Sequence, residues 1–167
     1  MLGHSCCFGQ PSTDNLAKVP GSPFTGGEII DISSVAVTPG VPFASAFAEL
    51  EIKAGLPAGF DLNESFTLGT NSNAINPLTE NVTLQIGTFS ITIPAASFKQ
   101  NRDGTFAFEG IINGVSLQVQ IVPLGNNFFT FKAQGAGVDL TGLTNPVTVV
   151  LTIGIDFVST PVTAQFQ

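Results

Sequence analysis

The stretch VTLQIGTFSITIPAASF, residues 82–98, decides the fold that we expect for this chain. Apolar and polar residues alternate on both sides of an Ile-Gly pair, which is typical of two short strands joined by a turn. A weaker copy, VVLTIGIDFVSTPVTAQF, occupies residues 149–166. Both copies contain Ile-Gly, a Phe soon after it, a Pro seven residues after the Gly and a terminal Phe. We interpret the pair as an internal duplication of a β unit.

The similarity continues upstream of each copy. Asn-Pro precedes both, at residues 76–77 and 145–146, and a strand-like run containing Phe-Thr precedes each Asn-Pro. The duplicated units therefore span about residues 64–98 and 127–166. We expect two similar halves that pack about a pseudo-twofold axis.

The rest of residues 28–167 predicts further strands and no helix. Residues 43–54, FASAFAELEIKA, contain good helix formers, yet Ala, Leu and Ile alternate with polar positions, so we predict a strand. Asn113-Gly114 lies between two apolar runs and predicts a hairpin with a type I′ turn. The same criteria place strands at 28–38, 64–70, 115–122 and 128–134, and loops at 55–63 and 123–127. About ten short strands predict a single all-β domain, an antiparallel sandwich or barrel.

Residues 1–27 differ from the rest, because Pro, Gly and Ser are scattered through them without a helical or strand period. Cys6 and Cys7 are adjacent and so cannot close an ordinary disulfide, and with His4 they form only one small cluster of metal ligands. We expect a disordered leader or a remnant of cloning. The basic start and the apolar stretch of a signal peptide are missing from this segment.

Composition limits the classes of partner. Twelve acidic and five basic residues give a formal net charge of −7, which opposes binding to nucleic acids or to an anionic membrane surface. No apolar run approaches the length of about 20 residues that a membrane helix needs, so we expect no membrane insertion. Only 10% of the residues are charged, a pattern typical of secreted and cell-surface β proteins.

Phenylalanine is the only aromatic residue, with 15 Phe and no Trp or Tyr. Most of these rings should lie in the core, because Phe has no polar group to place in water. The alternative is an apolar ligand cavity inside a barrel. The lack of Trp and Tyr argues against a sugar-binding platform of the usual aromatic kind.

Carboxylates are the only catalytic candidates in the predicted domain. The single His, His4, lies in the leader, which excludes a Ser-His-Asp or Cys-His arrangement within residues 28–167. Glu49 and Glu51 are two apart on a predicted strand, so their side chains leave the same face about 6 to 7 Å apart. That spacing suits glycoside hydrolysis, although pairs of charges on exposed strands are common.

Oxygen-bearing side chains cluster in two predicted turns or loops. Asn101 and Asp103 belong to an Asn-Arg-Asp-Gly turn, and Asp61, Asn63 and Glu64 lie close together in sequence. Calcium prefers hard oxygen ligands gathered in a loop, so both clusters are candidate calcium sites. Ordinary turn chemistry explains the same residues equally well. We expect no cofactor other than calcium.

Residues 75–154 resemble a β module that recurs, often in repeated copies, in exported proteins of environmental bacteria. Four motifs carry the resemblance: IPAASF at 93–98, FAFEGIINGV at 106–115, GVDLTG at 137–142 and NPVTVVLTIG at 145–154. The resemblance implies export and a β fold, and no known activity. Such modules usually continue with Asp-Asp after the last Ile-Gly, where this chain has Ile155-Asp156, so a shared cation site is not implied there. We expect Asp139 and Asp156 to cap turns.

Three functions remain open on these grounds. The first is a non-catalytic extracellular module of a bacterial protein, structural, adhesive or spacer, with a protein or glycan surface as partner. The second is a small hydrolase that uses Glu49 and Glu51, and the third is a β-barrel that binds an apolar ligand. Low charge also leaves strand edges open to self-association, and residues 160–166 are predicted to pair with their own sheet or with a neighbour's.

Overall fold

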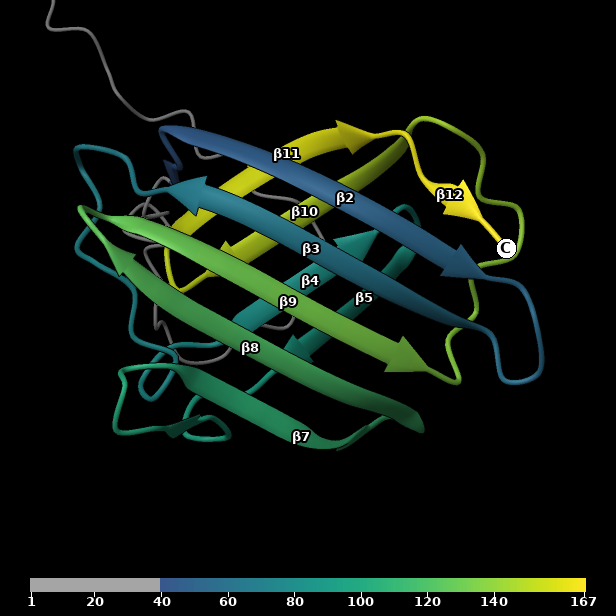
Figure 1. Ribbon diagram of the computed structural model, residues 1–167, viewed down its shortest axis with the longest axis horizontal. Helices are drawn as coiled ribbons and strands as arrows, with labels where there is room; N and C mark the ends of the chain where they lie inside the picture. The colour runs from purple at the N-terminus through teal and green to yellow at the C-terminus, as the bar shows by residue number, and fades with distance from the viewer. Residues whose placement is uncertain (1–39) are drawn as a thin grey trace, which may run out of the picture. The chain divides into compact units, whose positions relative to one another are not determined.

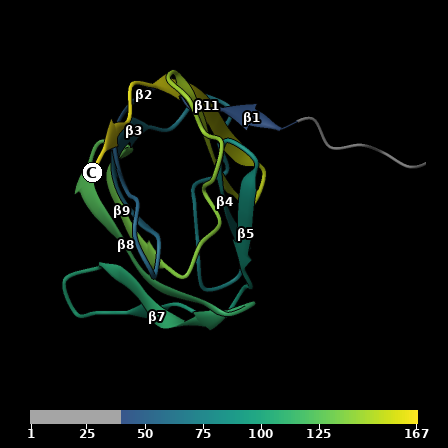
Figure 2. The same cartoon turned by 90° about the vertical axis from the view of Figure 1, so that its right-hand side faces the viewer.

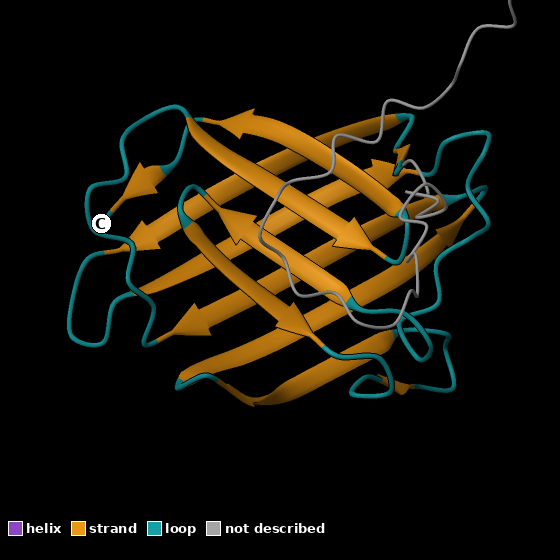
Figure 3. Cartoon of the chain, turned by 180° about the vertical axis from the view of Figure 1, so that it is seen from behind, coloured by secondary structure: helices purple, strands orange, loops and turns teal. Residues whose placement is uncertain are grey.

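The computed structural model describes residues 40–167, which form twelve strands and no helix (Figures 1 and 3). The all-β prediction is therefore confirmed for this part of the chain. The predicted leader at 1–27, with Cys6 and Cys7, and the predicted strand at 28–38 lie outside the described residues.

One sheet has five strands. Its order is β1 (Val41–Pro42), β11 (Asp156–Val162), β10 (Val147–Ile153), β4 (Val82–Ile86) and β5 (Phe89–Ile93). All of its pairs are antiparallel except β1 with β11. The hairpins β4–β5 and β10–β11, which contain the two copies of the Ile-Gly pattern, lie side by side and form most of this sheet.

The other sheet has seven strands. Its order is β12 (Gln165–Phe166), β2 (Ser45–Lys53), β3 (Gly59–Thr67), β9 (Phe128–Ala136), β8 (Val115–Gly125), β7 (Phe106–Ile112) and β6 (Lys99–Gln100). Only β12 and β2 are parallel. The long strands β2, β3, β9 and β8 form the broad face turned to the viewer in Figure 1.

The two sheets pack their apolar faces together and appear as separate layers in Figure 2. They do not close into a barrel within residues 40–167. Phe60 of β3 reaches Phe89 of β5 in the opposite sheet, with ring centroids 6.0 Å apart. Phe66 stacks against Phe43 at 4.3 Å and against Phe129 at 5.5 Å. These rings fill the space between the sheets, as the composition predicts for Phe, and the packing is that of a sandwich.

The hairpin predicted at Asn113-Gly114 is confirmed. The two residues have φ of 52° and 83°, the positive values that a type I′ turn requires at both central positions. The loop predicted at 123–127 is shorter in the structure, because β8 continues to Gly125 with an irregular register near Pro123. Proline favours turns, which is why the sequence predicts that the strand ends before Pro123. In the structure a bulge accommodates Pro123 inside the strand.

The loop predicted at 55–63 is wrong over its second half. β3 begins at Gly59, so Asp61 and Asn63 lie in a strand that pairs with β2 on one side and with β9 on the other. Asp, Asn and Gly favour turns in isolation, yet two ladders supply the backbone hydrogen bonds that hold this segment extended. The strand predicted at 43–54 is confirmed by β2.

Strand order has an approximate twofold pattern. The run β2-β3-β9-β8 forms the middle of the seven-stranded sheet, and the run β5-β4-β10-β11 forms most of the five-stranded sheet. In each run, two neighbouring strands from the earlier part of the chain pair with two neighbouring strands from the later part. Leu84 pairs with Leu151 in the β4–β10 ladder, and these leucines occupy the same position in the two copies of the Ile-Gly pattern. Gly87 and Gly154 hold equivalent turn positions, with φ of 58° and 60°. The ladder thus has the register that a twofold axis through the leucine pair would give.

Two crossings join the sheets along one side of the molecule, through Phe43 between β1 and β2 and through Ala164 between β11 and β12. Asn145 holds the second crossing, because its side chain donates to the Ala164 carbonyl at 2.9 Å and accepts from the Ala164 amide at 2.7 Å. Residues 160–166 therefore pair within their own chain, first with β10 and then with β2. Between the crossings, β2 and β11 lie side by side without a ladder between them (Figure 1).

Gly135→Ala should destabilise the fold. Gly135 pairs with Phe60, whose ring covers it, so an added Cβ would overlap this ring. Overpacking of this kind costs about 1 to 3 kcal/mol of the free energy of unfolding, which urea unfolding measures. The control is Gly55→Ala, where the new Cβ meets nothing closer than 4.0 Å. It should change stability by less than about 0.5 kcal/mol, and equal stability of the two variants would contradict the packing.

Candidate functional site

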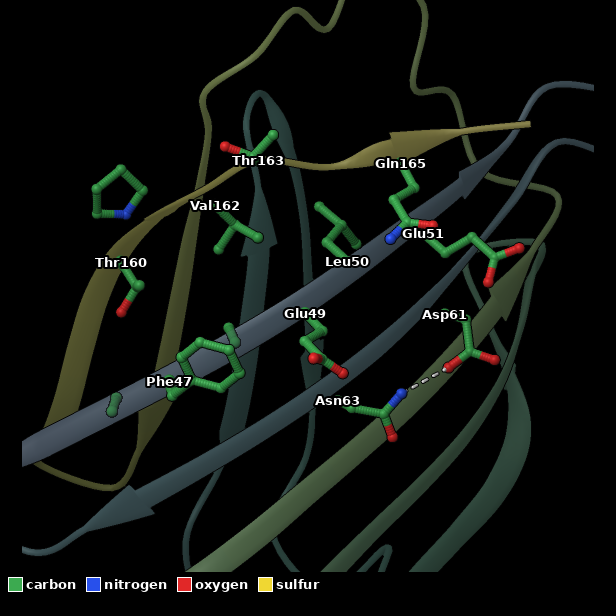
Figure 4. Close-up of a pocket in the computed structure, with 13 residues that line it drawn as sticks. Phe47, Glu49, Leu50, Glu51, Asp61, Asn63, Thr160, Val162, Thr163 and Gln165 are labelled. Atoms are coloured by element: carbon green, nitrogen blue, oxygen red, sulfur yellow. Dashed lines mark hydrogen bonds between the residues drawn. The ribbon is translucent and has the colours of Figure 1, made fainter.

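Glu49 and Glu51 lie on the outer face of β2, as the alternation predicts. Ala48, Leu50 and Ile52 point into the core, whereas Glu49 is exposed and Glu51 is half-buried. Both carboxylates leave the same face of the strand (Figure 4). They are therefore available to a molecule that approaches this face.

Two oxygen-bearing residues of β3 lie opposite this pair. Asn63 is the cross-strand partner of Glu49, and Asp61 is the partner of Glu51. The Asn63 side chain donates a hydrogen bond to Asp61 Oδ1 at 3.4 Å (Figure 4). Directly paired residues of antiparallel strands have Cβ atoms about 5 Å apart, so the three carboxylates share a small area.

The polar pattern continues across β9 and β8. Gln134 Nε2 donates a hydrogen bond to Asp61 Oδ2 at 2.7 Å and so joins the amide of β9 to the carboxylate of β3. A hollow of about 280 Å³ lies over this part of the sheet. We call the polar surface the amide face, and it consists of two cross-strand rows: Glu49-Asn63-Lys132-Gln120 and Glu51-Asp61-Gln134-Gln118.

A second hollow lies beside β2, next to the crossing from β11 to β12. Its volume is about 470 Å³, and the side chain of Phe47, which is 63% exposed, stands at it (Figure 4). We call this hollow the edge groove, and it is lined by residues 46–51, Asp61, Asn63, residues 160–163 and Gln165. The groove thus contains the predicted catalytic pair, Glu49 and Glu51.

Glu64 does not join Asp61 and Asn63, which corrects the prediction of a calcium site from these three residues. In a strand, neighbouring side chains point to opposite faces, so Asp61 and Asn63 face outwards and Glu64 faces the core. Glu64 is only 3% exposed, and neither of its carboxylate oxygens has a hydrogen-bond partner in the described part of the chain. Burial raises the pKa of Glu64 to about 7.

The two aspartates expected to cap turns behave differently. Asp139 Oδ1 accepts hydrogen bonds from the Thr141 hydroxyl at 2.7 Å and the Thr141 amide at 3.1 Å, which confirms a cap and lowers the pKa of Asp139. Asp156 caps no turn within residues 40–167, because its side chain is fully buried and neither oxygen accepts a hydrogen bond from these residues. Burial raises the pKa of Asp156.

The turn predicted at Asn101 and Asp103 is confirmed. The Gly104 amide donates to the Asn101 carbonyl at 3.1 Å, and Asp103 Oδ1 accepts from the Thr105 amide at 3.0 Å. One carboxylate oxygen of Asp103 therefore serves the turn itself. Within residues 40–167 no group of three or more His, Cys, Asp and Glu side chains is placed to hold a metal ion, and calcium binding at this turn stays a prediction.

Sequence reasoning found half of the amide face and missed the other half. The alternation in residues 115–122 places Gln118 and Gln120 on an outer face, but it does not say which strand lies beside them. Lys132 and Gln134 meet Asn63 and Asp61 only because β3 pairs with β9, a contact between segments 73 residues apart. No local pattern carries such a pairing.

No protein-family model, curated protein or solved structure matches the chain. The resemblance over residues 75–154 to an exported bacterial module therefore stays a prediction. The described strands and loops include no helix long and apolar enough to cross a membrane. Functional inference for this chain rests on the chemistry of its own surfaces.

Glu64→Gln should remove a pH dependence from the stability of the fold. The pKa of Glu64 rises on folding from 4.5 to about 7, so between these values the folded chain keeps a proton that the unfolded chain has lost. The free energy of unfolding of the unaltered chain should therefore fall as the pH rises through this window. The slope is about 1.4 kcal/mol per pH unit, or about 3 kcal/mol in total, and urea unfolding at a series of pH values measures it.

The matched control is Glu109→Gln, at an exposed position on β7. This variant should keep the slope of the unaltered chain. Burial raises the pKa of Asp156 in the same direction, so the contribution of Glu64 is the difference between the two variants. An identical pH dependence in both would mean that Glu64 is not buried in its protonated form.

Proposed function

We propose that this chain is a non-catalytic module of an exported bacterial protein and that it adheres to a neutral glycan through the amide face. The observation that carries the proposal is the pair of cross-strand polar rows, which no described element covers (Figure 1). Low charge and the resemblance of residues 75–154 to exported modules support the export.

The chemistry of the amide face suits a polyhydroxyl ligand. Each Gln or Asn side chain offers two N–H donors and one carbonyl acceptor, and each ionised carboxylate offers acceptors only. Neighbouring strands are about 4.8 Å apart and residues of one row lie on successive strands, so each row presents hydrogen-bonding groups at short, regular intervals. Paired hydroxyls of a sugar ring need donors and acceptors side by side, and Gln134 beside Asp61 supplies them.

Charge favours a neutral glycan over an acidic one. The two rows contain the carboxylates Glu49, Glu51 and Asp61 and a single cation, Lys132. An anionic polymer would be repelled by this excess and by the net charge of −7. The hollow of about 280 Å³ lies between the rows, where a sugar unit would be in reach of both.

The absence of a catalytic role is supported by where the carboxyl groups lie. A general acid at neutral pH needs a raised pKa, and the carboxyls of the described residues whose pKa burial raises, Glu64 and Asp156, are both buried. Glu49 is exposed on the outer face of β2. The apolar-carrier alternative loses its structural basis, because the sheets do not close into a barrel over residues 40–167 and Phe rings pack between them.

We further infer that the sandwich is built from two copies of one unit. The mirrored strand orders and the pairing of Leu84 with Leu151 support this inference. The units expected from sequence, 64–98 and 127–166, would then each extend upstream by one strand, β2 in the first copy and β8 in the second. A twofold scaffold of this kind suits a structural module that carries different surfaces on its two halves.

The double variant Gln118→Ala/Gln134→Ala should weaken glycan binding. Each lost hydrogen bond is worth about 1 kcal/mol, so the dissociation constant should rise about tenfold or more. Retention on immobilised neutral polysaccharides, followed by calorimetry on the best ligand, measures the effect. Ser90→Ala, an exposed change on the outer side of β5, is the control and should bind normally. Failure of the unaltered chain to bind any neutral glycan would refute the proposal.

A second candidate function, glycoside hydrolysis, is favoured by the carboxylates that line the edge groove. Under the proposal, the unaltered chain releases no reducing sugar from glycoside substrates, and Glu49→Gln and Glu51→Gln leave its unfolding nearly unchanged. Both residues lie on the outer face, where substitutions cost within about 0.5 kcal/mol. A turnover that both variants lose with the fold intact would make the chain a hydrolase instead.

A further inference from the structure

β2 has an unpaired edge between the two crossings. β12 pairs with β2 only at Glu51 and Ile52, and the Ile52 carbonyl accepts from the Gln167 amide at 2.9 Å. Backbone groups that face one edge recur at every second residue, so those of Leu50, Ala48 and Ala46 face the same side as Ile52. Among the described residues these three have no ladder partner on that side.

The unpaired edge opens onto the edge groove. Ala46, Ala48 and Leu50 line the groove from the β2 side. Thr160 and Val162 of β11 line it from the other side (Figure 4). The two strands lie side by side there, yet no ladder joins them. The gap therefore combines free backbone donors and acceptors with a volume of about 470 Å³.

We propose that the edge groove binds an extended peptide that adds as a strand to β2 and carries alternating basic and apolar residues. Main-chain hydrogen bonds to a sheet edge are available only to a polypeptide in extended conformation. This inference goes beyond adhesion to a glycan, since it concerns the backbone edge of β2, although the groove shares Glu49, Glu51, Asp61 and Asn63 with the amide face. An added strand would cover the gap on this side of the sandwich.

The apolar half of the pattern follows from the inner side of the groove. Ala48, Leu50 and Val162 are among the residues that line the groove, and their side chains are buried in the core. A strand placed beside β2 would direct every second side chain towards these residues. Small apolar side chains such as Val suit that position, because they extend the existing core without leaving a polar group unpaired.

The basic half of the pattern follows from the outer side. Glu49, Glu51 and Asp61 line the groove, and its lining includes no Lys or Arg. The other side chains of an added strand would lie beside Glu49 and Glu51, where Lys or Arg would be attracted. A second copy of this chain fits poorly, because it brings a net charge of −7 to an acidic groove. Exposed Phe47 offers a contact for one further apolar side chain.

The test uses the full chain and the fluorescently labelled peptide acetyl-KVKVKVK-amide, with binding followed by anisotropy. Saturable binding is expected, and the acidic counterpart EVEVEVE should not bind. Two further peptides carry N-methyl groups on all Val or on all Lys nitrogens. Methylation removes the N–H donors on one edge of the peptide strand without changing its charge. The peptide that loses the donors facing β2 should therefore bind about tenfold less tightly, or weaker still, than the other methylated peptide.

Ala48→Pro is the matched variant of the protein. Proline at this position removes an N–H that faces the groove and leaves the ladder to β3 in place, as is tolerated in edge strands. This variant should bind the peptide about tenfold less tightly and bind the glycan as the unaltered chain does. Gln118→Ala/Gln134→Ala should bind the glycan less tightly and leave peptide binding unchanged. Equal binding of both methylated peptides, or no saturable binding of acetyl-KVKVKVK-amide, would overturn the proposal whatever Ala48→Pro does.

Discussion

The pairing of β3 with β9 is the interaction on which the rest of the structure depends. It joins segments 73 residues apart in the sequence at the centre of the seven-stranded sheet. On the inner side it sets Phe60 over Gly135, from where the Phe60 ring meets Phe89 of the opposite sheet. On the outer side the same ladder sets Asp61 beside Gln134. One register therefore fixes both the core and the polar surface.

Local patterns in the sequence predict the elements that local physics controls. Asn113-Gly114 specifies its own turn, because few other residues adopt positive φ at both positions. The alternation in residues 43–54 identifies β2 against its helical propensity, since one face must be buried. The segment from Gly59 to Asn63 misleads for the complementary reason. Its residues favour a turn, and only two flanking ladders, which are invisible in the local pattern, make it a strand.

The same distinction explains what could be predicted of the surface. That Glu49 and Glu51 share a face follows from a period of two, and the structure places them so. That they line a groove depends on the crossing from β11 to β12, which Asn145 holds through two hydrogen bonds to Ala164. That Glu64 is buried depends on the register of β3, which places its side chain in the core without a hydrogen-bond partner among residues 40–167. The sequence predicts which side chains carry polar groups and which of them share a face of a strand. It does not predict which residues from other strands lie next to them.

An all-β chain must pair or protect the backbone N–H and C=O groups at the edges of each sheet. Short strands β1, β6 and β12 cover parts of the borders, each with only two residues. Among the described residues, no strand pairs with β2 between the crossings, and Glu49 and Glu51 lie along this stretch. In the proposed complex, the same carboxylates would oppose pairing with a second copy of the chain and favour a basic strand.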